Sequence, residues 1–165
     1  LYCIVMSYRI DDKTKSESID GLNYAKEVVA QRVNLPHRFE NIFKDIEIIS
    51  GGNGNIVCRY TIPKNLSNTH GSLHGGIIAS LVDAVSTWGL STATKHHRHI
   101  SVDLSVSYMR KAELGETITI EGKTVKLGGR VAFLTATLLD KNQKIIATGK
   151  HTKLILGPVD LESDQ

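Results

Sequence analysis

One acidic residue, Asp83, stands alone in a long uncharged part of the chain. Between Lys64 and Lys95 no other residue carries a formal charge, and most neighbours of Asp83 are apolar or small. A helix that is apolar on nearly every side is usually buried. Burial raises the pKa of a carboxyl group because it disfavours the charged form, which brings the group toward the range of a general base. Asp83 is therefore a candidate catalytic acid or base.

A second interpretation of Asp83 is purely local. Ser80, Ser86 and Thr87 lie three or four residues from it and would share its side of a helix. On this view the carboxylate only forms hydrogen bonds within a polar stripe. The helix sequence alone supports the two interpretations about equally.

The expected start of the same helix offers a second chemical element. Gly75 and Gly76 follow His74, and the first N–H groups of a helix lack partners within the helix. Glycine lets a ligand approach these donors closely, so they could stabilise an oxyanion. An isolated His-Gly-Gly sequence is more often a packing feature, and that alternative stays open.

The spacing of these two elements has a consequence for assembly. Gly75 and Asp83 are eight residues apart, which is about 12 Å along a helix. One scissile carbonyl cannot contact both groups of the same helix. If both act in one reaction, they come from different subunits, and a two-fold dimer with antiparallel helices would form two equivalent sites.

The elements around this helix indicate an α+β fold. Apolar residues at helical spacing predict a helix from Asp20 to about Pro36. We expect a long helix over 74–92 and strands over 46–49, 56–62, 100–108, 117–127, 130–139 and 144–156. In the strand over 100–108, alternation places five apolar residues on one face and Ser101 on the opposite face, and a bulge is expected at Gly122. An antiparallel sheet wrapped around one helix follows, with a flexible arm at 1–19, one domain at 20–157 and a tail at 158–165.

Composition excludes several other classes of function. Aromatic residues make up 5% of the 165 residues and the net charge is +3, so we expect no nucleic-acid binding. No run of about 18 apolar residues exists, which predicts a soluble protein without a membrane span. The two cysteines, Cys3 and Cys58, form no disulfide framework and indicate either a reducing compartment or a simple structural use.

The segment from Lys95 to His99 contains three histidines without a cysteine or acidic residue at zinc spacing. We interpret it as a solvated loop and expect no metal. The chain has no GxSxG, Walker or GxGxxG motif, and no cofactor is expected.

Several motifs together resemble the hotdog-fold thioesterases of the phenylacetate-pathway type. They are Asn68-Thr69-His70-Gly71-Ser72-Leu73-His74-Gly75-Gly76, Leu81-Val82-Asp83, Ser101-Val102-Asp103, Tyr108-Met109, Leu114-Gly115-Glu116, Ala132-Phe133 and Gly149-Lys150-His151-Thr152-Lys153. The resemblance runs from about Val28 to Lys153. It implies a hotdog fold for residues 20–157 and hydrolysis of acyl-coenzyme A thioesters of medium to long fatty acids.

The resemblance also implies a role for each matching residue. Asn68 and the Gly75 backbone N–H would hold the thioester oxygen. Asp83 of the partner subunit would activate water as a general base, with direct attack on the thioester as the alternative, and Ser101 would position that water. His74 would shape the loop at the helix entrance. The nucleotide end of coenzyme A would be bound by residues at the ends of strands and turns: Lys64, Tyr108, Arg110, Lys111, Lys126, Gly128, Gly129 and Arg130. Arg110 and Lys111 replace a serine-proline pair of the family.

The implied partner, besides the acyl-coenzyme A substrate, is a second copy of the chain, as a homodimer or a homotetramer built as a dimer of dimers. The cytoplasm or the mitochondrion is the expected location. Two alternatives remain: a non-catalytic acyl-coenzyme A binding module, and a hotdog hydratase. The hydratase would have a histidine about five residues after the aspartate, where this chain has Trp88.

Overall fold

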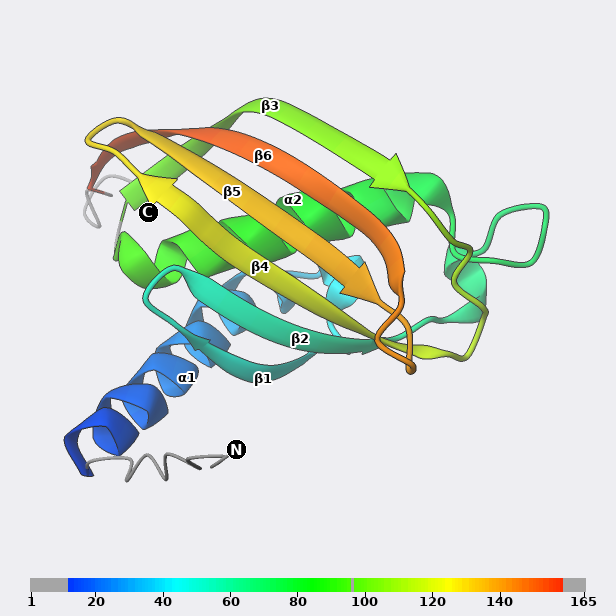
Figure 1. The fold of residues 1–165 in the computed structure, drawn as a ribbon, viewed down its shortest axis with the longest axis horizontal. Helices are drawn as coiled ribbons and strands as arrows, with labels where there is room; N and C mark the ends of the chain where they lie inside the picture. The colour runs from blue at the N-terminus through cyan, green and yellow to red at the C-terminus, as the bar shows by residue number, and fades with distance from the viewer. Residues whose placement is uncertain (1–11, 96, 159–165) are drawn as a thin grey trace, which may run out of the picture.

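A computed structural model describes residues 12–95 and 97–158 and shows one sheet folded around one helix (Figure 1). The elements in chain order are α1 (Asp12–Val33), the 3-10 helix η1 (Phe39–Phe43), β1 (Glu47–Gly52), β2 (Asn55–Thr61), the 3-10 helix η2 (Lys64–Leu66), α2 (Gly75–Ala93), β3 (His97–Tyr108), β4 (Thr117–Leu127), β5 (Val131–Leu139) and β6 (Ile145–Pro158).

The six strands form one antiparallel sheet in the order β1-β2-β4-β5-β6-β3. This sheet curves around α2, and α1 lies beside β1 (Figure 1). The core forms where Leu81, Val85 and Trp88 of α2 meet Ile120 of β4 and Ile146 of β6, all fully buried. The predicted α+β architecture with one central helix is confirmed.

The long helix α2 begins where the sequence predicts. The side chain of His74 caps it, because Nδ1 accepts a hydrogen bond from the Gly76 N–H at 2.9 Å. Eleven of its nineteen residues are buried, as expected for a helix that is apolar on most sides. Among the described residues, no helix is long and apolar enough to cross a membrane.

The first helix begins earlier than predicted. It starts at Asp12, within the segment expected to be a flexible arm, and not at Asp20. Residues 12–18 contain no glycine or proline and include good helix formers, so the helix extends without an apolar face. The prediction depended on apolar periodicity, which a polar helical extension does not show. Residues 1–11 of the predicted arm and 159–165 of the predicted tail lie outside the described residues.

The edge strand β3 contradicts the predicted facing of its side chains. Its register against β6 shifts between Ser101, which pairs with Lys153, and Asp103, which pairs with Thr152. This irregularity adds one residue and reverses the alternation. Ser101 therefore faces α2, on the same side as Tyr108, while Ile100 is 53% exposed.

The predicted bulge at Gly122 is also wrong. The register of β4 against β5 shifts between Thr124 and Lys126, whereas Gly122 pairs regularly with Ala136. Gly122 instead lies where the backbone of α2 closely approaches the sheet. A Cβ atom at this position would lie 2.7 Å from the backbone oxygen of Val85. Glycine is needed here because the helix backbone occupies the space of a side chain.

We expect Gly122→Ala to lower the free energy of unfolding by about 1–3 kcal/mol, because the added methyl group must push α2 away from the sheet. Chemical denaturation monitored by circular dichroism measures the change. Gly157→Ala is the matched control, since a Cβ atom at Gly157 in β6 meets no atom within 4 Å. Equal stability of the two variants would show that the helix does not press on β4 as described.

Candidate active site

The four predicted catalytic residues form two groups at different positions along α2. Asn68 and Gly75 lie at its N-terminal end, and Asp83 lies two turns further on, beside Ser101 of β3. Because Gly75 and Asp83 belong to one continuous helix, they are about 12 Å apart. The structure of one chain brings together the residues within each group and keeps the two groups apart.

The N-terminal group is organised by a tight turn. Oδ1 of Asn68 accepts hydrogen bonds from the backbone N–H groups of His70 and Ser72, and Nδ2 of Asn68 donates to Oγ of Ser72 at 3.0 Å. Gly71 adopts φ +73°, which closes this turn. The amide of Asn68 has a second N–H, so one donor is left for a ligand.

Gly75 supplies the second donor at this end. His74 uses its side chain to satisfy the N–H of Gly76, and within the described part of the chain the N–H of Gly75 has no partner. The hydroxyl of Tyr108 donates to the backbone oxygen of Gly75 at 3.2 Å and thus holds the peptide chain at this point. His74 therefore shapes the helix entrance, as predicted.

Asp83 does not have the deeply buried carboxylate that the sequence predicts. The helix around it is buried, but 48% of its side chain is exposed. The sheet covers only part of the circumference of α2, and the stripe that contains Asp83 stays open. This stripe forms the floor of a hollow of about 340 Å³ lined by Phe39, Glu40, Ser80, Asp83, Ala84, Thr87, Ser101 and Lys153.

The neighbouring hydroxyls explain only part of the environment of Asp83. The hydroxyl of Thr87 lies 2.7 Å from the backbone oxygen of Asp83 and 3.3 Å from Oδ1, so its hydrogen is closer to the backbone. The hydroxyl of Ser86 also donates to the backbone oxygen of Asp83, and that of Ser80 donates to Gly76. The local interpretation, in which helix hydroxyls satisfy the carboxylate, is therefore insufficient.

The closest groups from other elements come from β6. Lys153 places Nζ 3.7 Å from Oδ1 of Asp83 and donates hydrogen bonds to Oγ1 of Thr87 at 2.9 Å and to Oγ of Ser101 at 3.0 Å. Nε2 of His151 lies 3.0 Å from the same Ser101 oxygen and 3.6 Å from Oδ1 of Asp83. One carboxylate, one ammonium, an imidazole and two hydroxyls thus form a connected polar cluster.

His151 is neutral in this cluster. Its burial, followed by the charge of Lys153, lowers its pKa to about 4, and the opposing effect of Asp83 is smaller. Its Nδ1 lies 2.8 Å from Oγ of Ser86, whose hydrogen is directed to the backbone oxygen of Asp83. All these bonds form together only if Nδ1 carries the hydrogen and Nε2 accepts one from Ser101. We assign this tautomer to His151.

Sequence reasoning named Thr87 as a local partner of Asp83 but gave no role to His151 or Lys153 in this cluster. A signal existed for the two residues of β6. Ala147 and Gly149 alternate with them and are buried, so His151 and Lys153 fall on the core face of the strand. Polar residues at core positions of a strand are uncommon and point to a specific role.

The residues predicted to bind coenzyme A also separate into two groups. Lys64, Tyr108, Arg110 and Lys111 lie near the N-terminal end of α2, where Tyr108 pairs with Ala147 at the start of β6. Lys126, Gly128, Gly129 and Arg130 form the hairpin between β4 and β5, where Val131 pairs with Leu154 near the end of β6. The two groups are about 23 Å apart along β6. One chain alone does not bring them together.

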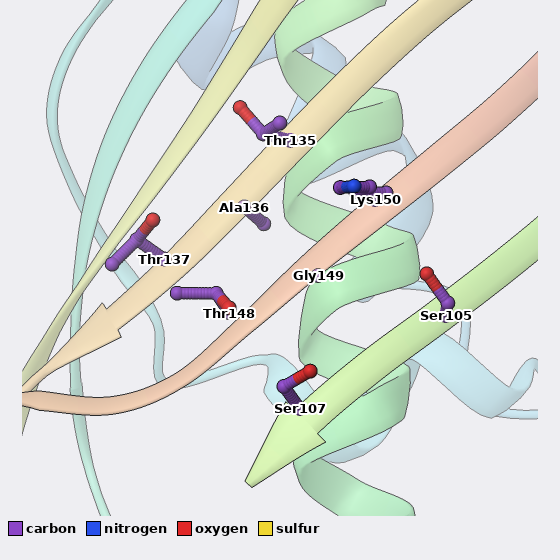
Figure 2. A pocket seen from close by; sticks show the side chains of 8 residues that line it. All are labelled: Ser105, Ser107, Thr135, Ala136, Thr137, Thr148, Gly149 and Lys150. Atoms are coloured by element: carbon purple, nitrogen blue, oxygen red, sulfur yellow. The ribbon is translucent and has the colours of Figure 1, made fainter. Parts of the chain in front are cut away.

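A second hollow lies on the face of the sheet that points away from α2 (Figure 2). Its side chains are mostly hydroxyls from β3, β5 and β6, and Lys150 is its single charged lining residue. It contains no carboxylate, imidazole or thiol. The hollow beside Asp83 is therefore the better candidate for chemistry.

The histidine segment differs from its prediction as a loop. From His97 onward it is part of β3, while His96 lies outside the described residues. His99 forms a hydrogen bond with Thr94, and burial lowers its pKa to about 4. Among the described residues, no group of three or more potential metal ligands comes together.

Comparisons with known proteins identify the family of this chain. Residues 70–147 match the family model of the thioesterase superfamily. Human acyl-coenzyme A thioesterase 13 is 35% identical over 126 residues, which cover 76% of this chain and 90% of that protein. A putative esterase of Schizosaccharomyces pombe is 29% identical over 135 residues, covering 81% of this chain and 84% of that protein.

Solved structures share the fold. Thioesterase superfamily member 2 of zebra fish is 35% identical and superposes with a TM-score of 0.76 over 81% of this chain and 97% of that chain. The E. coli PaaI protein is 20% identical and shares the fold with a TM-score of 0.69 over 81% of this chain and 96% of that chain. The sheet wrapped around one long helix is the hotdog architecture, and this chain belongs to the thioesterase superfamily.

Proposed function

We propose that this protein hydrolyses acyl-coenzyme A thioesters of medium to long fatty acids to the free acid and coenzyme A. The observation that carries the proposal is Asp83, a half-exposed carboxylate in a hollow on a largely buried helix, beside the hydroxyl of Ser101. The names of the relatives, which include acyl-coenzyme A thioesterases, support the substrate class.

The reaction needs an oxyanion site and a base on opposite sides of one thioester carbon. The N–H of Gly75 and the remaining N–H of Asn68 would donate to the thioester oxygen. Asp83 would accept a proton from a water molecule while that water attacks the carbonyl carbon. Collapse of the tetrahedral intermediate breaks the C–S bond, and the proton passes from Asp83 to the departing thiolate.

The two parts of this machinery would come from two subunits, because they are about 12 Å apart on one helix. The edge strand β3 supports a homodimer. It exposes one row of backbone groups together with apolar side chains, among them Val102, which is 64% exposed, and Tyr108 and Met109. Antiparallel pairing of two β3 strands around a two-fold axis would also align the two α2 helices antiparallel. Two such dimers would form the homotetramer.

The same symmetry would bring the two predicted coenzyme A groups together. A two-fold axis reverses the partner, so the partner's hairpin would approach the end of this chain that contains Arg110 and Lys111. Phosphate groups favour such cations and the free N–H groups of turns. Lys111 already forms an ion pair with Glu113 at 2.6 Å, with both side chains mostly exposed. We therefore propose Arg110 as the main cation for a phosphate group.

Two alternatives are less consistent with the site. A hydratase would need a histidine at position 88, but Trp88 is fully buried and its Nε1 donates to Glu40 at 3.2 Å. A non-catalytic binding module would have no need for a carboxylate beside Ser101.

The location that we propose is the cytoplasm or the mitochondrion. Cys58 is a free, buried thiol, and burial raises its pKa to about 12. Free thiols are typical of such reducing compartments.

We expect Asp83→Asn to reduce kcat for long-chain acyl-coenzyme A by roughly 10²–10⁴-fold with little change in KM, because the amide cannot accept the proton of water. Release of free thiol measures the rate, with a panel of acyl lengths to define the substrate. The exposed Asp45→Asn is the matched control. Wild-type rates in Asp83→Asn would exclude Asp83 as the base.

Mixing two inactive variants tests the shared site. In a dimer of one Asn68→Ala chain and one Asp83→Asn chain, one site combines the intact Asn68 with the intact Asp83, and the other site lacks both. Refolding the two variants together at equal amounts should restore about a quarter of wild-type activity, since half of the dimers are mixed and each has one intact site. Activity no higher than the mean of the two variants would place the whole site in one chain, and light scattering gives the oligomeric state.

A further inference from the structure

Lys153 is the least exposed residue with a formal charge in the described part of the chain. Only 4% of its surface is exposed, although lysine is almost never fully buried without a partner. Burial is the main cause that lowers its pKa. An ammonium group removed from water costs several kcal/mol unless charges and hydrogen bonds compensate for it. The position of Lys153 therefore needs an explanation.

The compensation comes entirely from the site beside α2. Nζ has three donors, and two of them are directed to Oγ1 of Thr87 and Oγ of Ser101, at 2.9 and 3.0 Å. The nearest carboxylate oxygen belongs to Asp83, at 3.7 Å. Lys153 thus contacts the proposed base and both hydroxyls that flank it.

Other charged groups around Lys153 also act on its ammonium group. Glu40 of η1 adds negative charge and Arg32 of α1 adds positive charge. His99 and His151 are neutral near pH 7, since both have a pKa of about 4. Asp103 of β3 acts on His151. Asp83 is the acidic group that both pairs with Lys153 and lines the hollow.

We propose, on the basis of the thioesterase function above, that Lys153 is a positioning residue that orients Ser101 and Thr87 and provides the counter-charge of Asp83. Lysine can only donate hydrogen bonds, so both hydroxyls must present a lone pair to Nζ. The hydrogen of Ser101 is then directed to Nε2 of His151, in the tautomer assigned above.

This arrangement determines what Ser101 can do for a water molecule. Its hydrogen is used by His151 and one lone pair by Lys153, so a second lone pair remains for the hollow. Ser101 therefore accepts a hydrogen bond from water. A water molecule that donates one hydrogen to Asp83 and the other to Ser101 keeps its own lone pair free to attack the thioester carbon. Lys153 acts on the reaction through these neighbours and does not touch the substrate.

A purely structural role, in which Lys153 only ties β6 to α2, predicts different kinetics. Loss of a structural tie would lower stability and the amount of folded protein, but kcat per folded enzyme would stay that of the wild type. Loss of the positioning contacts also lowers kcat of the folded enzyme, because the hydroxyls of Ser101 and Thr87 can then turn away from the water molecule.

The test compares Lys153→Met, Lys153→Gln and Lys150→Met with the wild type, by thiol release from acyl-coenzyme A. We expect Lys153→Met to reduce kcat by roughly 10–100-fold with little change in KM. Lys153→Gln retains N–H donors without charge, so it should recover part of kcat, and the part not recovered measures the contribution of the charge. Lys150→Met is the matched control, since Lys150 lies on the same strand, exposed on the outer face.

Several outcomes would contradict the inference. A wild-type kcat per folded enzyme in both Lys153 variants would overturn it, and so would equal kcat values for Lys153→Met and Lys153→Gln. Thermal unfolding shows whether each variant is folded, and if Lys153→Met is not, the kcat of folded Lys153→Gln decides. If the wild type and Lys150→Met hydrolyse no thioester in the panel, the proposed function fails, and the inference that rests on it fails as well.

Discussion

The close contact between α2 and the sheet is the constraint on which the rest of the molecule depends. Glycines make this contact possible at two strands: a Cβ atom at Gly122 would meet the backbone of Val85, and one at Gly149 would lie 2.3 Å from a methyl group of Val82. With the helix held this tightly, its apolar residues are buried and one stripe stays accessible. Asp83 lies on that stripe, so the packing of the core decides where the acid meets solvent.

Packing this close also places polar groups where they are costly. His151 and Lys153 occupy core positions of β6. An apolar pair at these positions would avoid the free-energy cost of removing polar groups from water. Their hydrogen bonds to Ser86, Thr87 and Ser101 join α2, β3 and β6 into one network. A fully satisfied network of this kind orients each hydroxyl in a single direction. Orientation of a water molecule beside Asp83 is the use that we propose for it.

The single chain forms the whole fold but keeps the two parts of the proposed site apart. Its free donor at Gly75 and its carboxylate at Asp83 are separated by two turns of one rigid helix, which no side-chain motion can shorten. The coenzyme-binding residues expected from the resemblance are separated in the same way, at the two ends of β6. A two-fold axis beside β3 would solve both problems at once. The exposed apolar residues of that edge strand agree with such an interface.

Much of the fold followed from local patterns in the sequence. The apolar run of α2, its glycine-rich start and its single acid are properties of neighbouring residues, so they predicted the buried helix and the separation of Gly75 from Asp83. Where a pattern was polar or interrupted, prediction failed: α1 begins before its apolar face, and the register shift in β3 turns Ser101 toward α2.

The surroundings of Asp83 depended on the tertiary structure alone. Thr87 and Lys153 are 66 residues apart in the sequence, and Ser101 and Lys153 are 52 apart. Their contacts exist because β6 pairs with β3 in one register and because α2 packs against both strands. Local sequence determined that an isolated acid would lie on a buried helix. Strand pairing between distant segments decided that the acid would be half exposed and paired with a buried lysine, since no local pattern encodes register.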